Sequence, residues 1–98
     1  MIRHVVMFRW KPETTPEDVA AIEEGLGKMP AEVPEIQRYT FGADAGINEG
    51  NYDFVVVADF ATADDYVVYR DNPTHRAFIE QHTRPNMAER ASVQFEFD

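Results

Sequence analysis

The stretch IRHVVMFRW, residues 2–10, decides the fold because its side chains alternate between the two faces of an extended strand. One face is almost wholly apolar and carries Ile2, His4, Val6, Phe8 and Trp10. The opposite face is half apolar and carries Arg3, Val5, Met7 and Arg9. A strand with apolar residues on both faces predicts a sheet that is covered on one side and not fully wet on the other.

A helix is predicted to follow this strand directly. Thr15 is a good N-cap, Pro16 suits the first helical position, and acidic residues in the first turn complement the helix dipole. An apolar stripe then recurs every three or four residues, at Val19, Ile22, Leu26 and Met29. Two glycines and Pro30 are expected to end this helix, with a loop over residues 30–35.

The rest of the chain alternates between strand and helix patterns. Strands are predicted over residues 36–41, ended by Gly42, and over residues 52–60, with a Gly- and Asp-rich loop between them. A helix opens at Thr62 and runs to about residue 69, and a further helical stretch follows Pro73 to about residue 82. Residues 91–97 alternate again, with Val93, Phe95 and Phe97 on one face.

The resulting order, β-α-β-β-α-β, predicts an α+β, ferredoxin-like fold with one antiparallel four-stranded sheet and helices on one face. We expect a single domain over residues 1–98. The sheet's second face would expose apolar side chains of the first and third strands, Val5, Met7, Val55 and Val57. A two-fold homodimer that pairs sheet against sheet would cover them.

The charge of the chain excludes several functions. The net charge is −9, so the clustered Lys and Arg residues that bind nucleic acid or anionic membranes are not expected. There are no cysteines and no apolar run of the ~20 residues that a membrane helix needs. With no signal-peptide pattern at the N-terminus, the sequence predicts a cytoplasmic protein.

The candidate site is the segment YRDNPTHRAF, residues 69–78. Tyr69 can donate a hydrogen bond to a carbonyl, and His75 can take or give a proton near neutral pH. His4 is predicted to face the same helices from the first strand. These three side chains are the candidate catalytic residues, in a small-molecule pocket lined by aromatic residues: Phe8, Trp10, Tyr52, Phe54, Tyr66 and Phe78.

Other interpretations of these residues stay open. Tyr69 and His75 can instead serve as a helix cap and a packing pair, with His75 bonded to a backbone carbonyl. A metal set would need His4, His75 and His82 with Asp71 or Glu80, but no pair among them has a recognised ligand spacing, so we expect no metal. A nucleophilic triad and a phosphate-binding glycine loop are not indicated.

Two segments resemble the Dabb family, the stress-responsive dimeric A/B barrel domain. Residues 1–11 look like its H-x-V-x-F-K-like opening, and residues 69–78 look like its Y-x-x-H-P-x-H-x-x-F segment. The resemblance covers essentially the whole chain. It implies a sandwich that dimerises through its sheets into a barrel, and most members have no assigned reaction. A plant branch works without a cofactor, and we expect none here.

A plant branch of the family cyclises linear polyketide chains, and there the residues matching Tyr69 and His75 act as orienting donor and general base. The chain departs from that branch at Asn72, which replaces a His, and at Phe54, which replaces a pocket His. We therefore predict a stress-associated protein that binds a small apolar or aromatic ligand. The alternative is a cofactor-independent cyclase or isomerase. A heme-free monooxygenase shares the dimeric fold, but no residue here points to it.

Overall fold

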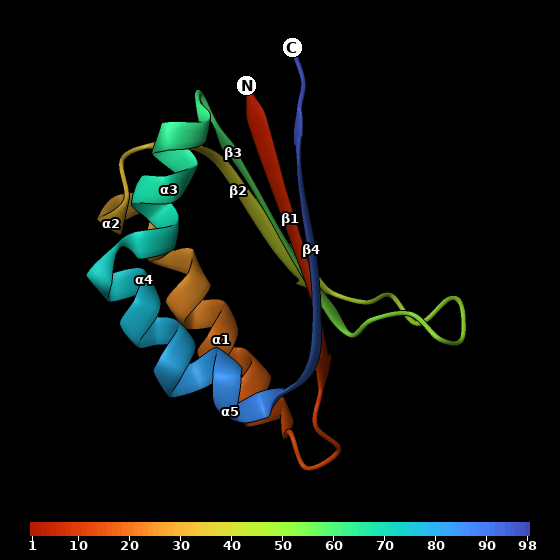
Figure 1. Cartoon of the computed structure of the whole chain (residues 1–98). Coiled ribbons are helices and arrows are strands. Elements are labelled where there is room, and N and C mark those ends of the chain that lie inside the picture. Colours follow the sequence, from red (N-terminus) through yellow and green to blue (C-terminus); the bar gives the residue numbers. More distant parts are fainter.

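One antiparallel sheet of four strands, in the order β2-β3-β1-β4, forms the base of the structure. The computed structural model describes all residues from 1 to 98. Strand β1 (Ile2–Trp10) lies between β3 (Phe54–Phe60) and β4 (Met87–Glu96), and β2 (Ile36–Ala43) forms the other edge. All helices cover one face of this sheet, and both termini lie at the same end of it (Figure 1). The predicted ferredoxin-like, β-α-β-β-α-β arrangement is confirmed.

The two main helices begin where the sequence predicts. Thr15 caps α1 (Pro16–Gly27) through a reciprocal capping box with Asp18, whose backbone N–H donates to Thr15 Oγ1 at 3.1 Å. Thr62 caps α3 (Ala63–Asp71) in the same position. Both caps satisfy backbone N–H groups that a helix start leaves without partners. None of the helices is long and apolar enough to span a membrane.

Several boundaries differ from the sequence prediction. The segment predicted as a loop from residue 30 contains a short helix, α2 (Met29–Glu32), because Pro30 fits the first turn of a helix. Strand β2 continues through Gly42 to Ala43, and β3 starts at Phe54 rather than at Tyr52. At this end of the sheet the backbone N–H of Trp10 donates to the Asp53 carboxylate at 2.8 Å and not to a backbone carbonyl.

The helical layer that starts at Pro73 runs past its predicted end near residue 82. Helix α4 (Pro73–Phe78) passes into a π-helical turn (Ile79–Thr83) and a last turn, α5 (Arg84–Asn86). The chain then enters β4 at Met87, four residues earlier than the alternation from Ala91 predicts. This continuous layer is packed beside α1, over the inner face of the sheet (Figure 1).

The strand register separates an inner and an outer sheet face. Val6 pairs with Val56 and Phe8 with Phe54, and all four side chains are buried under the helices. The outer face carries the four residues predicted for it, and the register of β4 adds Val93 and Phe95. We call this surface the open face: Val5, Met7, Val55, Val57, Val93 and Phe95. Val93 and Phe95 on this face are 57% and 45% exposed. A face of this kind is unusually apolar for a surface that meets water.

Candidate functional site

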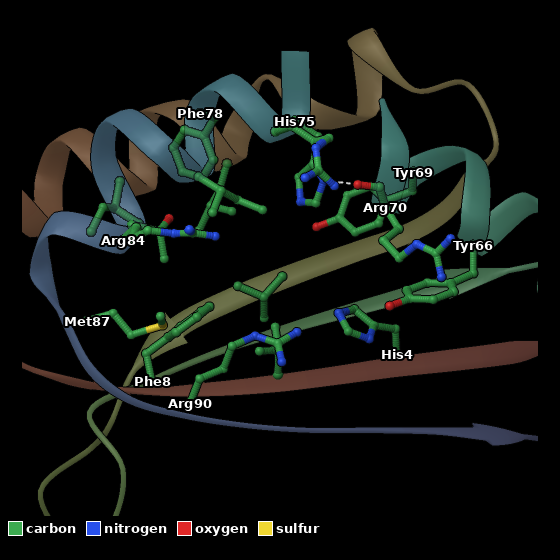
Figure 2. A pocket seen from close by; sticks show the side chains of 17 residues that line it. His4, Phe8, Tyr66, Tyr69, Arg70, His75, Phe78, Arg84, Met87 and Arg90 are labelled. Atoms are coloured by element: carbon green, nitrogen blue, oxygen red, sulfur yellow. Dashed lines mark hydrogen bonds between the residues drawn. The ribbon is translucent and has the colours of Figure 1, made fainter. Parts of the chain in front are cut away.

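A cavity of about 330 Å³ lies between the inner face of the sheet and the helices α1, α3 and α4. Its floor is apolar, formed by side chains of β1, β3, α1 and α4 such as Val6, Phe8, Leu26 and Phe78. Its other end is polar and contains the side chains of His4, Tyr66, Tyr69 and His75 (Figure 2). The cavity therefore has the composition typical of a small-molecule pocket.

His75 reaches the cavity because Asn72 starts helix α4 one turn before it. The Asn72 Oδ1 atom accepts from the backbone N–H groups of Thr74 at 2.9 Å and His75 at 3.1 Å. Pro73 occupies the first turn, where its missing N–H is not needed. The helix cap is thus the side chain of Asn72, not Tyr69 or His75. This gives a structural role to the residue at which the chain departs from the family's usual segment.

The His75 ring packs against the Tyr69 ring, with centroids 4.0 Å apart and the ring planes tilted by 31°. His75 Nδ1 lies 3.4 Å from the Arg70 carbonyl oxygen, which can only accept, so the ring proton sits on Nδ1. The Nε2 atom then carries a lone pair and has no protein partner. Every fully buried side-chain nitrogen and oxygen in the structure has a hydrogen-bond partner. Because Nε2 has none, it is not fully buried and is accessible from the cavity.

Burial lowers the pKa of His75, and the bonds to backbone carbonyls only partly oppose this. The ring is therefore neutral at pH 7 and able to accept a proton. It packs against Tyr69 and also presents a base to the cavity, so the packing interpretation and the ligand interpretation describe the same arrangement.

Tyr69 lies in the last turn of helix α3 and is 3% exposed. Its hydroxyl lies 2.9 Å from the hydroxyl of Tyr39 on β2. Burial raises the pKa of Tyr69 to about 12, so the phenol is neutral at pH 7. When Tyr39 donates this hydrogen bond, the hydroxyl hydrogen of Tyr69 is free to donate to a ligand.

His4 comes from the middle of β1, where it pairs with Ala58 and Gln94 on either side. The Gln94 amide nitrogen donates to His4 Nδ1 at 2.8 Å, so the ring proton is on Nε2. Burial lowers the pKa of His4 to about 4, and the positive charge of Arg90 adds to the effect. His4 thus offers an N–H donor where His75 offers a lone pair, and its ring lies 4.9 Å from Tyr66.

The predicted aromatic lining is only partly at the cavity. Phe8, Tyr66 and Phe78 line it, whereas Trp10, Tyr52 and Phe54 do not. Trp10 stacks on Phe8 at 5.4 Å and Phe54 on Phe41 at 6.4 Å, which places both rings in the solid core beyond the cavity. Tyr52 precedes β3. The guanidinium carbon of Arg9 lies over the Tyr52 ring, 4.2 Å from the ring centre.

The alternative metal set is not assembled. No three His, Asp or Glu side chains come together in the structure. His82 does not line the cavity and packs against Phe78, with ring centroids 5.6 Å apart. Asp71 pairs with Arg70 at 2.9 Å and Glu80 with Arg84 at 3.2 Å, so both carboxylates are used in surface ion pairs.

Four arginines that are absent from the predicted site also line the cavity, namely Arg70, Arg76, Arg84 and Arg90. A signal for Arg90 is present in the sequence. Because Val93 and Phe95 belong to the open face, the alternation of β4 directs Arg90 toward the helices, opposite Phe8. The other three arginines belong to the helical layer, and only the packing of that layer shows which of its residues border the cavity.

The fold has clear relatives. The model of the Stress Responsive A/B Barrel Domain (Dabb) family matches residues 2–97. A dimeric ferredoxin-like protein of unknown function from Thermobifida fusca is 45% identical, with a TM-score of 0.90 over 98% of this chain and 90% of that one.

Two more distant structures share the fold. A hydroxynitrile lyase from Passiflora edulis is 17% identical, with a TM-score of 0.86 over 99% of this chain and 93% of the lyase. A putative antibiotic biosynthesis monooxygenase from Nitrosomonas europaea is 18% identical, with a TM-score of 0.79 over 99% and 98%. No curated protein sequence matches significantly. With its family model matched over nearly the whole length, the chain belongs to the Dabb family of stress-responsive A/B barrel domains.

Proposed function

We propose that the protein binds a small apolar or aromatic molecule in the cavity between the sheet and the helices. The observation that carries this proposal is the convergence of His4, Tyr69 and His75 on one end of a cavity whose floor is apolar. A volume of about 330 Å³ lies within the range of small-molecule sites. The apolar end would hold the body of the ligand, and the polar end would hold one oxygen or nitrogen group of it.

Tyr69 and Tyr39 provide a matched pair of variants for testing this proposal. Either substitution by Phe breaks the same 2.9 Å hydrogen bond and leaves one buried hydroxyl without a partner. Only Tyr69 lines the cavity, so only Tyr69→Phe removes a hydroxyl from the ligand site.

Acetophenone is a suitable probe because it joins an aromatic body to one carbonyl acceptor. We expect similar losses of stability in the two variants and weaker acetophenone binding in Tyr69→Phe alone, measured by calorimetric or NMR titration. Equal affinities in wild type and both variants would exclude the proposed contact. Absence of acetophenone binding to the wild-type protein would count against the pocket itself.

The second candidate is a cofactor-independent enzyme of the isomerase or cyclase class. It is favoured by one observation: a neutral imidazole acceptor on His75 and N–H and O–H donors on His4 and Tyr69 border the same cavity. In this mechanism His75 Nε2 takes a proton from the carbon next to a carbonyl. The enolate oxygen receives hydrogen bonds from Tyr69 and His4, and the proton then returns from His75 to another carbon.

Proton abstraction is measurable without knowledge of the natural substrate. An active base would exchange the methyl protons of acetophenone for deuterium in D₂O, which proton NMR follows directly. General-base catalysis contributes about 10²–10⁴-fold, so His75→Gln should abolish most of the exchange. If the protein binds acetophenone but does not exchange its methyl protons faster than buffer alone, the protein is a binding protein and the enzyme hypothesis is rejected. The lyase and monooxygenase among the structural relatives, each below 20% identity, share the fold with this chain and carry no activity over to it.

We further propose that the protein is a homodimer joined through the open face of its sheet. The proposal is supported by the apolar side chains of that face, of which Met7, Val93 and Phe95 are exposed, and by the 45% identical relative, which is described as dimeric. Pairing two open faces would bury both apolar surfaces around a two-fold axis. Multi-angle light scattering that gave a monomer at micromolar concentration would reject it.

A further inference from the structure

The charge of the cavity wall is opposite to the charge of the chain. The protein has 18 acidic and 9 basic residues, yet the cavity lining contains four arginines and no Asp or Glu. The four arginines come from α3, α4, α5 and β4 and are exposed at the rim. The cavity is therefore a positively charged opening in an acidic protein, which attracts anions and disfavours cations.

Two of these guanidinium groups have no acidic partner. Arg70 and Arg84 are paired with Asp71 and Glu80 on the helix surface. No carboxylate lies within 4.0 Å of Arg76 or Arg90. In a chain with twice as many acids as bases, two arginines without an ion pair at one cavity rim leave their charge available to a ligand.

Arg90 is the better placed of the two. It lies opposite Phe8 in the register of β1 and β4, on the inner face of the sheet. Figure 2 shows its side chain reaching from β4 toward the cavity between Phe8 and His4. Its one hydrogen bond is to Ser92 Oγ at 3.2 Å, which leaves the other N–H groups of the guanidinium free.

We infer that the ligand is a carboxylate with an apolar or aromatic body, whose carboxylate is bound by Arg90 at the cavity rim. This inference rests on the proposed binding function and names the chemical class of its ligand. The planar guanidinium matches a carboxylate with two parallel N–H···O bonds, and Arg76 adds positive charge on the helix side. The body then occupies the apolar floor between Phe8 and Phe78, and His4 and Tyr69 hold any further oxygen of the ligand.

The test compares 3-phenylpropanoate with 3-phenylpropanamide, a neutral molecule of nearly the same shape. We expect the carboxylate to bind about tenfold more tightly, because a charged hydrogen-bonded pair replaces a neutral one. Arg90→Gln should remove this preference and leave the affinity for the amide unchanged. Lys28→Gln is the matched control, since it removes one positive charge from the end of α1, outside the cavity, and should keep the preference.

The results distinguish failure of the carboxylate inference from failure of the proposed binding function. Equal affinity for carboxylate and amide would overturn this inference and leave the proposed binding function standing. An equal loss in Arg90→Gln and Lys28→Gln would overturn the assignment to Arg90 and indicate long-range attraction only. If neither compound binds at millimolar concentration, both the inference and the proposed function fail. Near-UV circular dichroism checks that Arg90→Gln, an exposed substitution, retains the native packing.

Discussion

Gly25 connects the packing of the helices to the shape of the cavity, and replacing it by alanine perturbs both. A Cβ atom at Gly25 would overlap the Cδ1 and Cε1 atoms of the Phe78 ring and would lie 3.3 Å from Cζ. Phe78 is 8% exposed and forms part of the cavity wall. The ring cannot move outward without losing its packing, so it would be pushed toward the cavity.

The expected effect is a loss of about 1–2 kcal/mol of stability. Overpacking a core by one methyl group typically costs about 1–3 kcal/mol, and alanine returns up to about 1 kcal/mol over glycine inside a helix. Gly27 is the matched control because it lies in the same helix and a Cβ there meets nothing within 4 Å. Gly27→Ala should be neutral or stabilising by up to about 1 kcal/mol.

Urea unfolding at fixed protein concentration measures both variants, with the single tryptophan, Trp10, as the fluorescent probe. Gly25→Ala should have the lower midpoint and also the weaker affinity for 3-phenylpropanoate, because the displaced ring fills part of the cavity. If Gly25→Ala is as stable as Gly27→Ala and binds as well as wild type, then Phe78 does not pack against α1 as described.

Three further predictions concern the polar end of the cavity, the open face and a helix cap. The pKa of His4 is about 4 in the fold against 6.5 in the unfolded chain, so its neutral form is favoured by folding. Urea unfolding should therefore show that wild type loses about 1–2 kcal/mol more stability than His4→Gln when the pH falls from 7.5 to 4.5. The full pKa shift of His4 sets an upper limit of about 3 kcal/mol, and contact of the ring with the cavity reduces the expected loss. A parallel loss in the two proteins would refute the assignment. Phe95→Asp places a charge on the open face and should convert the dimer into a monomer by light scattering, whereas a dimer that survives would locate the interface elsewhere. Thr15→Ala removes the capping bond to Asp18 and should cost about 1 kcal/mol in thermal or urea unfolding, and no loss would show that the capping box contributes little.

The parts of the fold that the sequence predicts are those set by local chemistry. The alternation of residues 2–10 determines which side chains of β1 face the helices. The start of α1 is determined by the side chains of Thr15, Pro16 and Asp18 themselves. The ends of β2 and β3 are different, because they depend on long-range bonds such as that between Asp53 and the Trp10 N–H. The two-residue alternation of side chains along a strand does not show at which residue its pairing with the neighbouring strand stops.

The same distinction applies to the cavity. The sequence identifies three side chains that can exchange protons or donate hydrogen bonds, and the topology brings all three to the cavity: His4, Tyr69 and His75. Tyr52 was expected beside them because it was assigned to β3, but it precedes the strand and its ring is held by Arg9. The arginine rim was missed because its members are separated along the chain and meet only when β4 lies beside the helical layer.

The central claim is that the cavity between sheet and helices binds a small molecule, and NMR mapping of a ligand tests it most directly. Backbone amide shifts of the ¹⁵N-labelled protein would be followed during titration with 3-phenylpropanoate. Binding as proposed predicts saturating shifts that gather at Tyr66, His75 and Phe78, with little change at Val5 and Val93 on the open face. Shifts confined to the open face, or none at millimolar ligand, would contradict it.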